Sequence, residues 1–212
     1  MLEVWQDATL ARGTEPHMTT QGVTVASGGV AAADSPRAVS VPLNQRALAP
    51  TPPERIRRIR EHLVRSLRDL RTMKQPERDA SPLRPEPGGF AGTVARAGCA
   101  LCGGYCCKGG GEHAYLDERT MARVRRCRPK LDARAVIRLY MERVPAEGYA
   151  GSCVFHGKQG CTLDRSLRSD VCNSYFCNGL RDFVATADGA AGVVVTGVGA
   201  DGETRVLPVL TR

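Results

Sequence analysis

Eight of the nine cysteines fall into two groups whose spacing suits metal binding. The first group is the stretch CALCGGYCC at 99–107, with gaps of two, three and zero residues between cysteines. The second group is spread over 153–177, with gaps of seven, ten and four residues. The candidate ligands are Cys99, Cys102, Cys106, Cys107, Cys153, Cys161, Cys172 and Cys177. Four plus four thiolates are what two all-cysteine tetrahedral sites need, and iron–sulfur clusters also use thiolates. The spacing therefore predicts zinc or iron, including an iron–sulfur cluster, without choosing between them.

The first group has features of a metal knuckle. Cys99 and Cys102 can turn both sulfurs toward one ion. The two glycines that follow Cys102 let the backbone fold tightly and aim N–H groups at sulfur. Cys106 and Cys107 are adjacent, and neighbouring side chains of an extended segment point to opposite sides. The pair therefore favours two metal centres or one multinuclear cluster.

Three further residues could in principle bind the metal as well. Cys127 stands apart from both groups and is predicted to be a small buried apolar residue. His113 and His156 could each replace a cysteine, because imidazole also suits zinc. Eight cysteines at plausible spacing make either histidine the less favoured ligand.

Four segments resemble a known family. They are CALCGGYCC (99–107), CVF (153–155), GCTL (160–163) and RSDVC (168–172). In the same order they are similar to the motifs of the YkgJ-type cysteine-cluster proteins, which are zinc- or iron-chelating domains with a Cys-x2-Cys-x2-Cys-Cys hallmark. The resemblance covers roughly residues 95–180 and implies metal chelation through the cysteines. It also implies that Arg168 is structural or offsets thiolate charge; the alternative is a surface arginine.

The chain departs from that family in three ways. Three residues, not two, separate Cys102 from Cys106, Ser169 stands where the family often has proline, and the loop after Cys161 is one residue longer. These differences concern loop conformation more than ligands. The family is distantly linked to a lysine methylase that modifies flagellin. This chain has no fingerprint for a methyl donor, so the resemblance does not carry that activity over.

Composition points to a reducing compartment. The start of the chain has Glu3 and Asp7 where a signal peptide would be basic, and no apolar run follows. No stretch reaches the length of a membrane span. The expected location is the cytoplasm, where clustered cysteines are metal ligands or redox groups more often than disulfides.

The net charge of +8 suggests a polyanionic partner. However, eight thiolates binding two divalent ions would cancel most of the positive excess of the cysteine-rich part, because ligands must lose their protons. The charge is therefore weak support for nucleic-acid binding.

The chain is predicted to divide into four parts. Residues 1–53 are rich in small residues and proline and are expected to be disordered. Residues 54–74 form a basic amphipathic helix, 75–90 a proline-rich linker, and 91–212 a cysteine-cluster metal-binding domain. The expected fold is a small, cysteine-rich, metal-stabilised α+β domain with short helices and a C-terminal β-hairpin.

Local sequence patterns predict three helices and one β-hairpin. In residues 54–74, apolar residues recur at three- and four-residue steps, and the preferred interpretation is a helix packed on the domain with a solvated basic face. Short helices are expected over 117–127 and 131–143, with Asp117 and Asp132 as N-caps. Residues 192–210 predict a hairpin that turns at Asp201-Gly202 and returns along an edge containing Pro208.

Several functions remain open. The first is a zinc- or iron-chelating protein using the eight cysteines. The second is a redox or group-transfer enzyme with an iron–sulfur centre, for which no catalytic residue can be named. The third is a nucleic-acid or protein-binding module with structural zinc, acting through the basic helix. A disulfide scaffold is the weakest, because no secretory signal is present.

Overall fold

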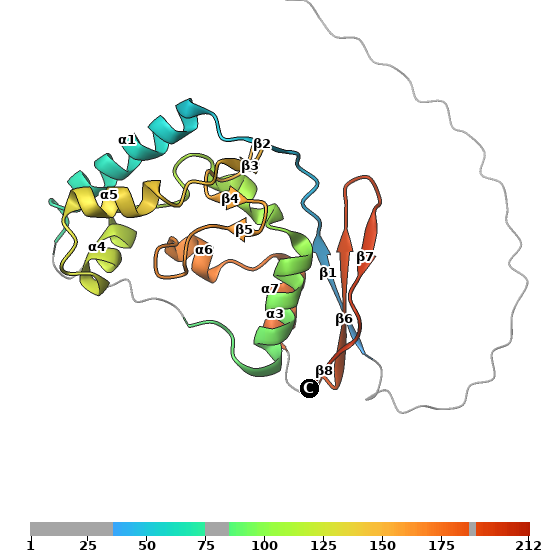
Figure 1. Cartoon of the computed structure of the whole chain (residues 1–212). Coiled ribbons are helices and arrows are strands. Elements are labelled where there is room, and N and C mark those ends of the chain that lie inside the picture. Colours follow the sequence, from blue (N-terminus) through green and yellow to red (C-terminus); the bar gives the residue numbers. More distant parts are fainter. Residues whose placement is uncertain (1–35, 75–84, 187–189) are drawn as a thin grey trace, which may run out of the picture. The chain divides into compact units, whose positions relative to one another are not determined.

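The computed structural model describes residues 36–74, 85–186 and 190–212, which fold into helices and two small sheets (Figure 1). These residues form a small α+β fold with a mixed sheet and an antiparallel sheet. The helices are α1 (Pro53–Asp69), α3 (Gly89–Cys102), the 3₁₀ helix η1 (Tyr105–Gly110), α4 (Glu118–Cys127), α5 (Ala133–Met141), α6 (Asp170–Ser174) and α7 (Asn178–Ala185). The strands are β1 (Arg37–Pro42), β2 (Leu48–Pro50), β3 (Glu147–Tyr149), β4 (His156–Gly157), β5 (Gly160–Cys161), β6 (Gly192–Val198), β7 (Thr204–Val206) and β8 (Leu210–Thr211).

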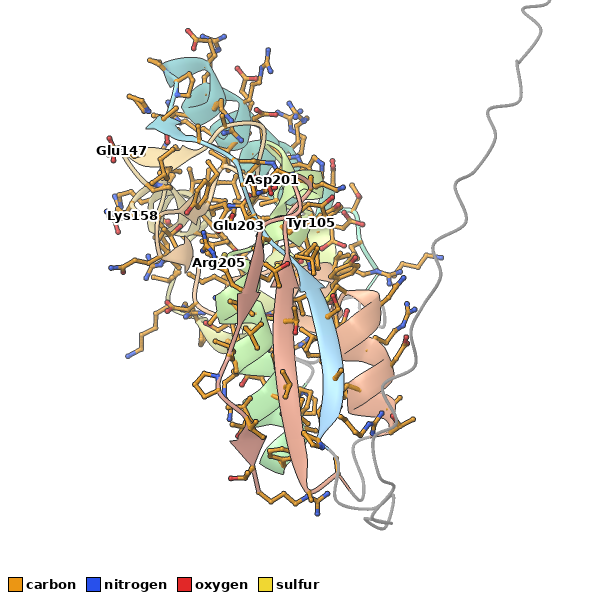
Figure 2. The ribbon with its side chains drawn as sticks, turned by 90° about the vertical axis from the view of Figure 1, so that its right-hand side faces the viewer. Tyr105, Glu147, Lys158, Asp201, Glu203 and Arg205 are labelled. Atoms are coloured by element: carbon orange, nitrogen blue, oxygen red, sulfur yellow. The ribbon has the colours of Figure 1, made fainter. Side chains whose placement is uncertain are left out.

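The first sheet joins segments from opposite ends of the chain. β1 pairs in parallel with β6, with Arg37 opposite Val193 and Pro42 opposite Val198. β7 and β8 both pair antiparallel with β6. Val39, Val41, Val193 and Val195 are buried against α3 and α7, which lie behind the sheet in Figure 2.

The predicted C-terminal hairpin is present, with one difference. Its first strand is β6, and its return strand is divided into β7 and β8 with Pro208 between them. Proline cannot donate a ladder hydrogen bond, which accounts for the gap.

The second sheet is antiparallel, in the order β2-β3-β4-β5. Its last pair places Cys161 opposite His156. β2 therefore connects the N-terminal part of the described chain to the segment that carries the later cysteines.

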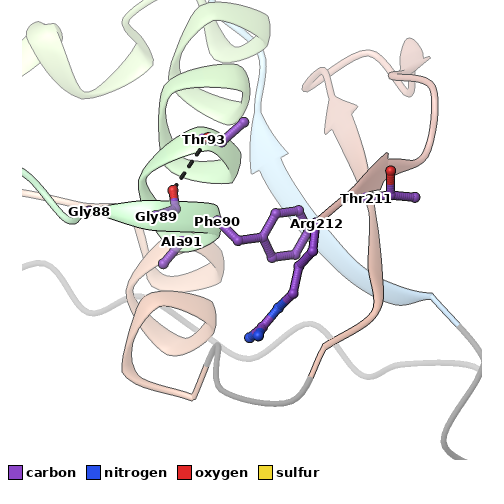
Figure 3. Close-up of a pocket in the computed structure, with 7 residues that line it drawn as sticks. All are labelled: Gly88, Gly89, Phe90, Ala91, Thr93, Thr211 and Arg212. Atoms are coloured by element: carbon purple, nitrogen blue, oxygen red, sulfur yellow. Dashed lines mark hydrogen bonds between the residues drawn. The ribbon is translucent and has the colours of Figure 1, made fainter.

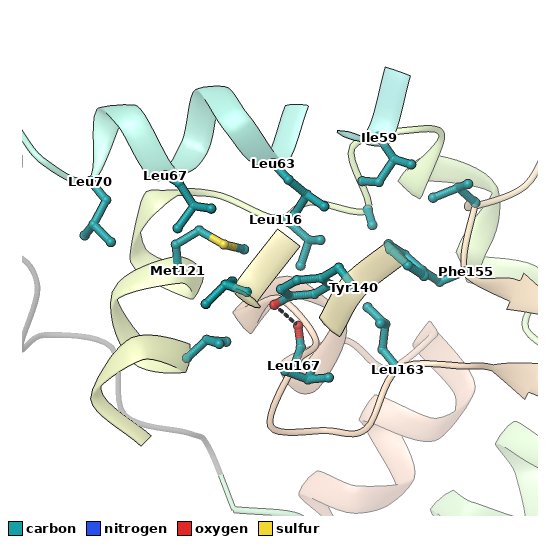
Figure 4. Packing of buried hydrophobic residues seen from close by; sticks show 14 of the residues in the cluster. Ile59, Leu63, Leu67, Leu70, Leu116, Met121, Tyr140, Phe155, Leu163 and Leu167 are labelled. Carbon is teal, nitrogen blue, oxygen red and sulfur yellow. Dashed lines mark hydrogen bonds between the residues drawn. The ribbon is translucent and has the colours of Figure 1, made fainter. Parts of the chain in front are cut away.

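Helix α1 supplies one wall of the larger hydrophobic core. Ile59, Leu63, Leu67 and Leu70 are buried there against α4, α5 and the cysteine-bearing loops (Figure 4). Tyr140 lies in the same core and donates its hydroxyl hydrogen to the carbonyl oxygen of Leu167 at 2.8 Å. The predicted helix is thus present but ends at Asp69, before residue 74, and most of its apolar stripe is packed on the domain, whereas Ile56 is 38% exposed.

The two short helices were also predicted correctly. The Asp117 carboxylate accepts the Thr120 N–H at 2.8 Å at the start of α4. The Asp132 carboxylate accepts the Ala135 N–H at 2.7 Å at the start of α5. Both carboxylates therefore cap orphan amides as their positions indicated.

The prediction of disorder through residue 53 is wrong for the part described. Strands β1 and β2 lie within this segment, and the backbone of the two residues after β1 is hydrogen-bonded to distant parts of the chain. The Leu43 N–H donates to the Val198 carbonyl at 2.9 Å, and the Asn44 N–H donates to the Cys102 carbonyl at 2.8 Å. The partners are more than fifty residues away, so local periodicity carried no sign of them. Residues 1–35 lie outside the described residues.

The predicted boundary at residues 90 and 91 is also wrong, because α3 begins at Gly89. The helix was missed because its sequence, GFAGTVARAGCALC, contains three glycines and no capping side chain. One of them, Gly98, allows close contact with α7: a Cβ there would lie 2.9 Å from the Leu180 side chain. Residues 75–84 of the predicted linker lie outside the described residues.

Cys127 is exposed at the end of α4, so the prediction that it is buried is wrong. The apolar face of α4 turns Met121 and Val124 into the core, and Cys127 follows in the last turn beyond it.

Candidate metal centre

Four cysteines from three separate segments line one cavity of about 440 Å³. Cys99 and Cys102 are on the last turns of α3, Cys106 is on η1, and Cys177 is the residue before α7. We call these four the outer quartet. Tyr105, Tyr175 and Phe176 are among the residues that line the rest of the cavity, which therefore has aromatic as well as thiol surface.

The turn between Cys102 and Cys106 is built for close approach. Gly103 ends α3 in the left-handed conformation, at φ 62°, and its N–H donates to the Cys99 carbonyl at 3.2 Å. The chain then reverses into η1, and the Tyr105 N–H donates to the Cys102 sulfur at 3.4 Å. This N–H···S contact is the kind that the glycine pair was expected to allow.

The other four cysteines, Cys107, Cys153, Cys161 and Cys172, form the inner quartet. The Cys153 N–H donates to the Cys107 carbonyl at 3.0 Å, which ties the early group of cysteines to the later one. Cys161 is on β5, and Cys172 is on α6, where the Ser169 hydroxyl accepts the Cys172 N–H at 3.1 Å. Cys153 is buried in the larger core, and Cys107 and Cys161 pack against that core.

Electrostatic coupling follows the same division in part, with Cys106 acting across it. Burial raises the pKa of the Cys99 thiol to about 12, and charge on the other three outer thiols adds to the rise. Burial likewise raises the pKa of Cys153 to about 12, with charge on Cys161 and Cys172 adding to it. Burial raises the pKa of Cys172 too, and charge on Cys161 and on Cys106 of the outer quartet adds to the rise. Each thiol is therefore easier to ionise if a cation offsets its neighbours.

Cys106 and Cys107 are where the quartets meet. The Cys107 thiol donates a hydrogen bond to the Cys106 sulfur, which lowers the pKa of Cys106 and raises that of Cys107. The segment is a 3₁₀ helix, so the expectation of an extended strand with opposed side chains is wrong. The two residues still belong to different quartets. Cys106 lines the cavity, whereas charge on Cys153 and Cys161 raises the pKa of Cys107.

Arg168 acts on both quartets. Its charge lowers the pKa of Cys99 in the outer quartet and that of Cys172 in the inner one, against the larger effect of burial on each. Its Nε–H donates to the Leu163 carbonyl at 2.8 Å, which fixes the guanidinium in place. This position fits a residue that offsets thiolate charge better than it fits an unattached surface arginine.

His156 positions the chain around the cysteines. Its ring is buried, its Nε2 donates to the Gly103 carbonyl at 3.0 Å, and its Nδ1 accepts from the Ser152 hydroxyl at 2.8 Å. A carbonyl can only accept, which assigns the proton to Nε2. Burial lowers the pKa of His156, in keeping with a neutral ring. Both nitrogens are thus engaged in joining the turn after Cys102 to the loop that carries Cys153.

The other candidate histidine lies elsewhere. The Nδ1 of His113 accepts the Tyr115 N–H at 2.9 Å. His113 lines a different cavity together with His62. The structure therefore groups His113 with His62 instead of with the cysteines.

Sequence reasoning missed one residue that supports the inner quartet. Arg123 is 1% exposed and donates to the carbonyls of Ser166, at 2.9 Å, and of Arg168. It also pairs with Asp170 at 3.3 Å, at the start of the helix that carries Cys172. Its only sequence signal is its place beside Ala122 and Val124 on the buried face of α4, among several other arginines of that helix.

The thiols are gathered but not yet at ligand spacing. All nine cysteines are free thiols. Within residues 36–74, 85–186 and 190–212, no group of three or more His, Cys, Asp or Glu side chains is arranged to hold a metal ion. The side chains of each quartet would therefore have to draw together around an ion.

A larger cavity, of about 550 Å³, lies where α3 begins (Figure 3). Its wall consists of Gly88, Gly89, Phe90, Ala91, Thr93, Thr211 and Arg212. The guanidinium of Arg212 lies 5.9 Å from the centre of the Phe90 ring. No thiol, imidazole or carboxyl side chain lines this cavity, whereas the cavity at the other end of α3 is lined by four thiols.

No protein-family model, curated protein or solved structure matches this chain. None of the helices in the described part of the chain combines the length and the apolar character needed to cross a membrane.

Proposed function

We propose that this protein binds zinc or iron through its eight clustered cysteines, held as the outer and inner quartets. The observation that carries the proposal is the cavity lined by Cys99, Cys102, Cys106 and Cys177, which come from three segments of the chain. Sulfur is the donor that zinc, copper(I) and iron–sulfur centres prefer. We also propose membership of the YkgJ-type family, on the motif resemblance alone.

The donor set fits such a group. Each quartet offers four thiols, the number that a tetrahedral all-cysteine site uses. Arg168 stands near both quartets and would offset part of their negative charge. When bound, zinc would cross-link the segments, and an iron–sulfur cluster would add electron transfer. The chain's own contribution is to bring the thiols together and to shield them partly from water.

Metal binding would also stabilise the fold. The inner quartet joins four short segments of the chain, which are η1, the loop before β4, β5 and α6. Metal sites are rarely formed in the unfolded chain, so binding free energy becomes folding free energy. We therefore propose that the domain is metal-stabilised, and that it works in a reducing compartment such as the cytoplasm, where thiols stay free.

An enzyme with an iron–sulfur centre is the second candidate. One observation favours it: the cavity beside the outer quartet has the size of a small-ligand site. An optical spectrum of anaerobic protein separates the two candidates. A coloured protein that bleaches with dithionite supports the enzyme, and a colourless zinc protein removes it.

A nucleic-acid or protein partner on the basic helix is the third candidate. Arg57, Arg58 and Arg60 are exposed on α1, while most of the apolar stripe of that helix is already buried. Binding to DNA and RNA should then fall steeply as salt rises. Unchanged binding after Arg58→Gln and Arg60→Gln removes this candidate.

Metal analysis tests the main proposal. Protein purified without oxygen should carry metal, and Cys161→Ser and Cys177→Ser should each lose the ion of their own quartet. Cys127→Ser is the matched control, because this cysteine is exposed and belongs to neither quartet. A folded protein with neither zinc nor iron contradicts the proposal, as does full metal content in both quartet variants.

A further inference from the structure

The two quartets differ in how they meet solvent. In the outer quartet Cys99 and Cys106 are exposed, Cys102 and Cys177 belong to or pack against the smaller core, and all four thiols line a cavity. In the inner quartet Cys172 alone is exposed, and the other three members belong to or pack against the larger core. A small molecule can therefore approach the outer thiols along a cavity, whereas the inner thiols require movement of packed side chains.

Packing around the inner quartet is tight. A Cβ placed on Gly110 would lie 2.8 Å from the Cβ of Cys153 and 3.0 Å from its sulfur. A Cβ placed on Gly104 would lie 3.3 Å from the sulfur of Cys107. The backbone of Gly104, just before η1, and of Gly110, at its end, thus approaches these thiols closely, and little space is left for an entering ligand.

The outer cavity has room and an accessible edge. Its volume of about 440 Å³ lies within the range of small-ligand sites, roughly 300–1,000 Å³. Tyr175 and Val198 line it and are 54% and 41% exposed. Exposed apolar and aromatic residues at the edge of a thiol-lined cavity suit the approach of another metal-binding molecule more than they suit a sealed structural site.

Resting on the proposed function, we infer that the outer quartet is an exchange site for a thiophilic metal ion carried as cargo, and that the inner quartet retains its ion. The substrate of the outer site is then the metal ion itself. Release is ligand exchange: the acceptor's donor atoms replace the thiolates one by one, and each departing thiolate takes up a proton from water. No electron is transferred.

Kinetics of zinc transfer test this inference. The full chain is loaded with Zn²⁺, mixed with an excess of the chromogenic chelator 4-(2-pyridylazo)resorcinol, and followed by absorbance. Two phases of equal amplitude are expected, and the first should be at least about tenfold faster, because the inner site opens only when core packing does. The variant Cys177→Ser should lack the fast phase. A single phase in the native chain overturns the inference.

A second measurement identifies the thiols without relying on a variant that folds. The reaction is stopped after the fast phase with N-ethylmaleimide, and the labelled peptides are mapped by mass spectrometry. Label is expected on Cys99, Cys102, Cys106 and Cys177, in addition to the exposed Cys127 that belongs to neither quartet. Equal or earlier label on Cys153 and Cys161 contradicts the inference while leaving metal binding intact. Failure of the native chain to bind Zn²⁺ refutes the proposed function itself.

The cavity edge offers a test that leaves every ligand in place. Val198→Trp adds bulk at the edge and should slow the fast phase several-fold without changing its amplitude. Val206→Trp is the matched control, because Val206 is 60% exposed on the neighbouring strand and does not line the cavity. Equal rates in the two variants count against entry through the cavity.

Discussion

The outer and inner quartets contain the same four side chains in different surroundings. The outer thiols line a cavity between α3, η1 and α7, whereas most of the inner thiols pack in the core that α1, α4 and α5 complete. Sulfur donors alone do not decide whether a metal is structural or exchangeable. The packing around them does, because it sets how much of the fold must open before a ligand can leave.

The largest expected effect comes from removing an inner ligand. Cys161→Ser should lower the free energy of unfolding by at least ~3 kcal/mol, because the metal would contribute to folding and Cys161 packs against the larger core, where a lost ligand leaves partly buried thiols without their ion. Chemical denaturation of the metal-loaded protein measures this loss.

Cys177→Ser is the outer counterpart, and its loss should be clearly smaller. Position 177 precedes the first turn of α7 without a side-chain cap, and serine is a better cap than cysteine. Equal losses of stability in the two variants would break the contrast between the quartets.

Next is the buried arginine behind the inner quartet. Arg123→Met should cost about 3 kcal/mol, because it removes the buried ion pair with Asp170 and the hydrogen bonds to the carbonyls of Ser166 and Arg168. It should also weaken metal binding at the inner site, since the segment that it holds carries Cys172.

Arg125→Met provides the comparison on the same helix, because Arg125 is exposed. It should change stability by less than about 0.5 kcal/mol. Thermal unfolding and metal titration of both variants give the two readouts. Unchanged inner-site affinity in the Arg123 variant would show that the arginine serves α4 alone.

A smaller effect is expected at the turn between the quartets. Gly104 has φ 79°, and a Cβ there would lie 2.5 Å from the Nε2 atom of His156. Gly104→Ala therefore adds a clash to backbone strain and should cost ~2–3 kcal/mol. Denaturant unfolding measures the combined cost of the clash and the backbone strain.

Gly202→Ala measures the cost of backbone strain without a clash. Gly202 has φ 86°, and nothing lies within 4 Å of its Cβ position. Its cost should be near ~1 kcal/mol. If the two alanine variants lose the same stability, His156 does not lie close enough to Gly104 to clash with a Cβ there.

The smallest effect concerns pH in the metal-free protein. The pKa values of Cys99 and Cys153 are raised from near 9 to about 12 in the fold. The folded chain therefore holds these protons more tightly than the unfolded one, so the stability they contribute is present below pH 9 and is lost as pH rises toward 12. Unfolding followed by circular dichroism across this range should show the decline. The zinc-loaded protein should resist it, since its thiols are already deprotonated.

Local signals predicted the elements that depend on local residues. The stripe of α1, the caps Asp117 and Asp132, and the Asp201-Gly202 hairpin could each be predicted from spacing. β1 and α3 could not. β1 is held by parallel pairing with β6, far along the chain, and α3 contains glycines that are tolerated because Leu180 packs against one of them.

The candidate site shows the same limit. The eight cysteines could be selected by count and spacing, but spacing could not predict which four would share a cavity. Cys106 and Cys107 are adjacent in sequence and contribute to different quartets, and Cys177 joins the early cysteines by the fold alone. Arg123 and His156 act through buried contacts that only the fold reveals.

Native mass spectrometry of the anaerobically purified chain, followed by alkylation mapping, tests the central claim most directly. We expect two sites filled by metal, eight cysteines protected from alkylation, and Cys127 labelled. A folded chain without metal, with disulfide bonds among these cysteines or with Cys127 among the protected ones would contradict it.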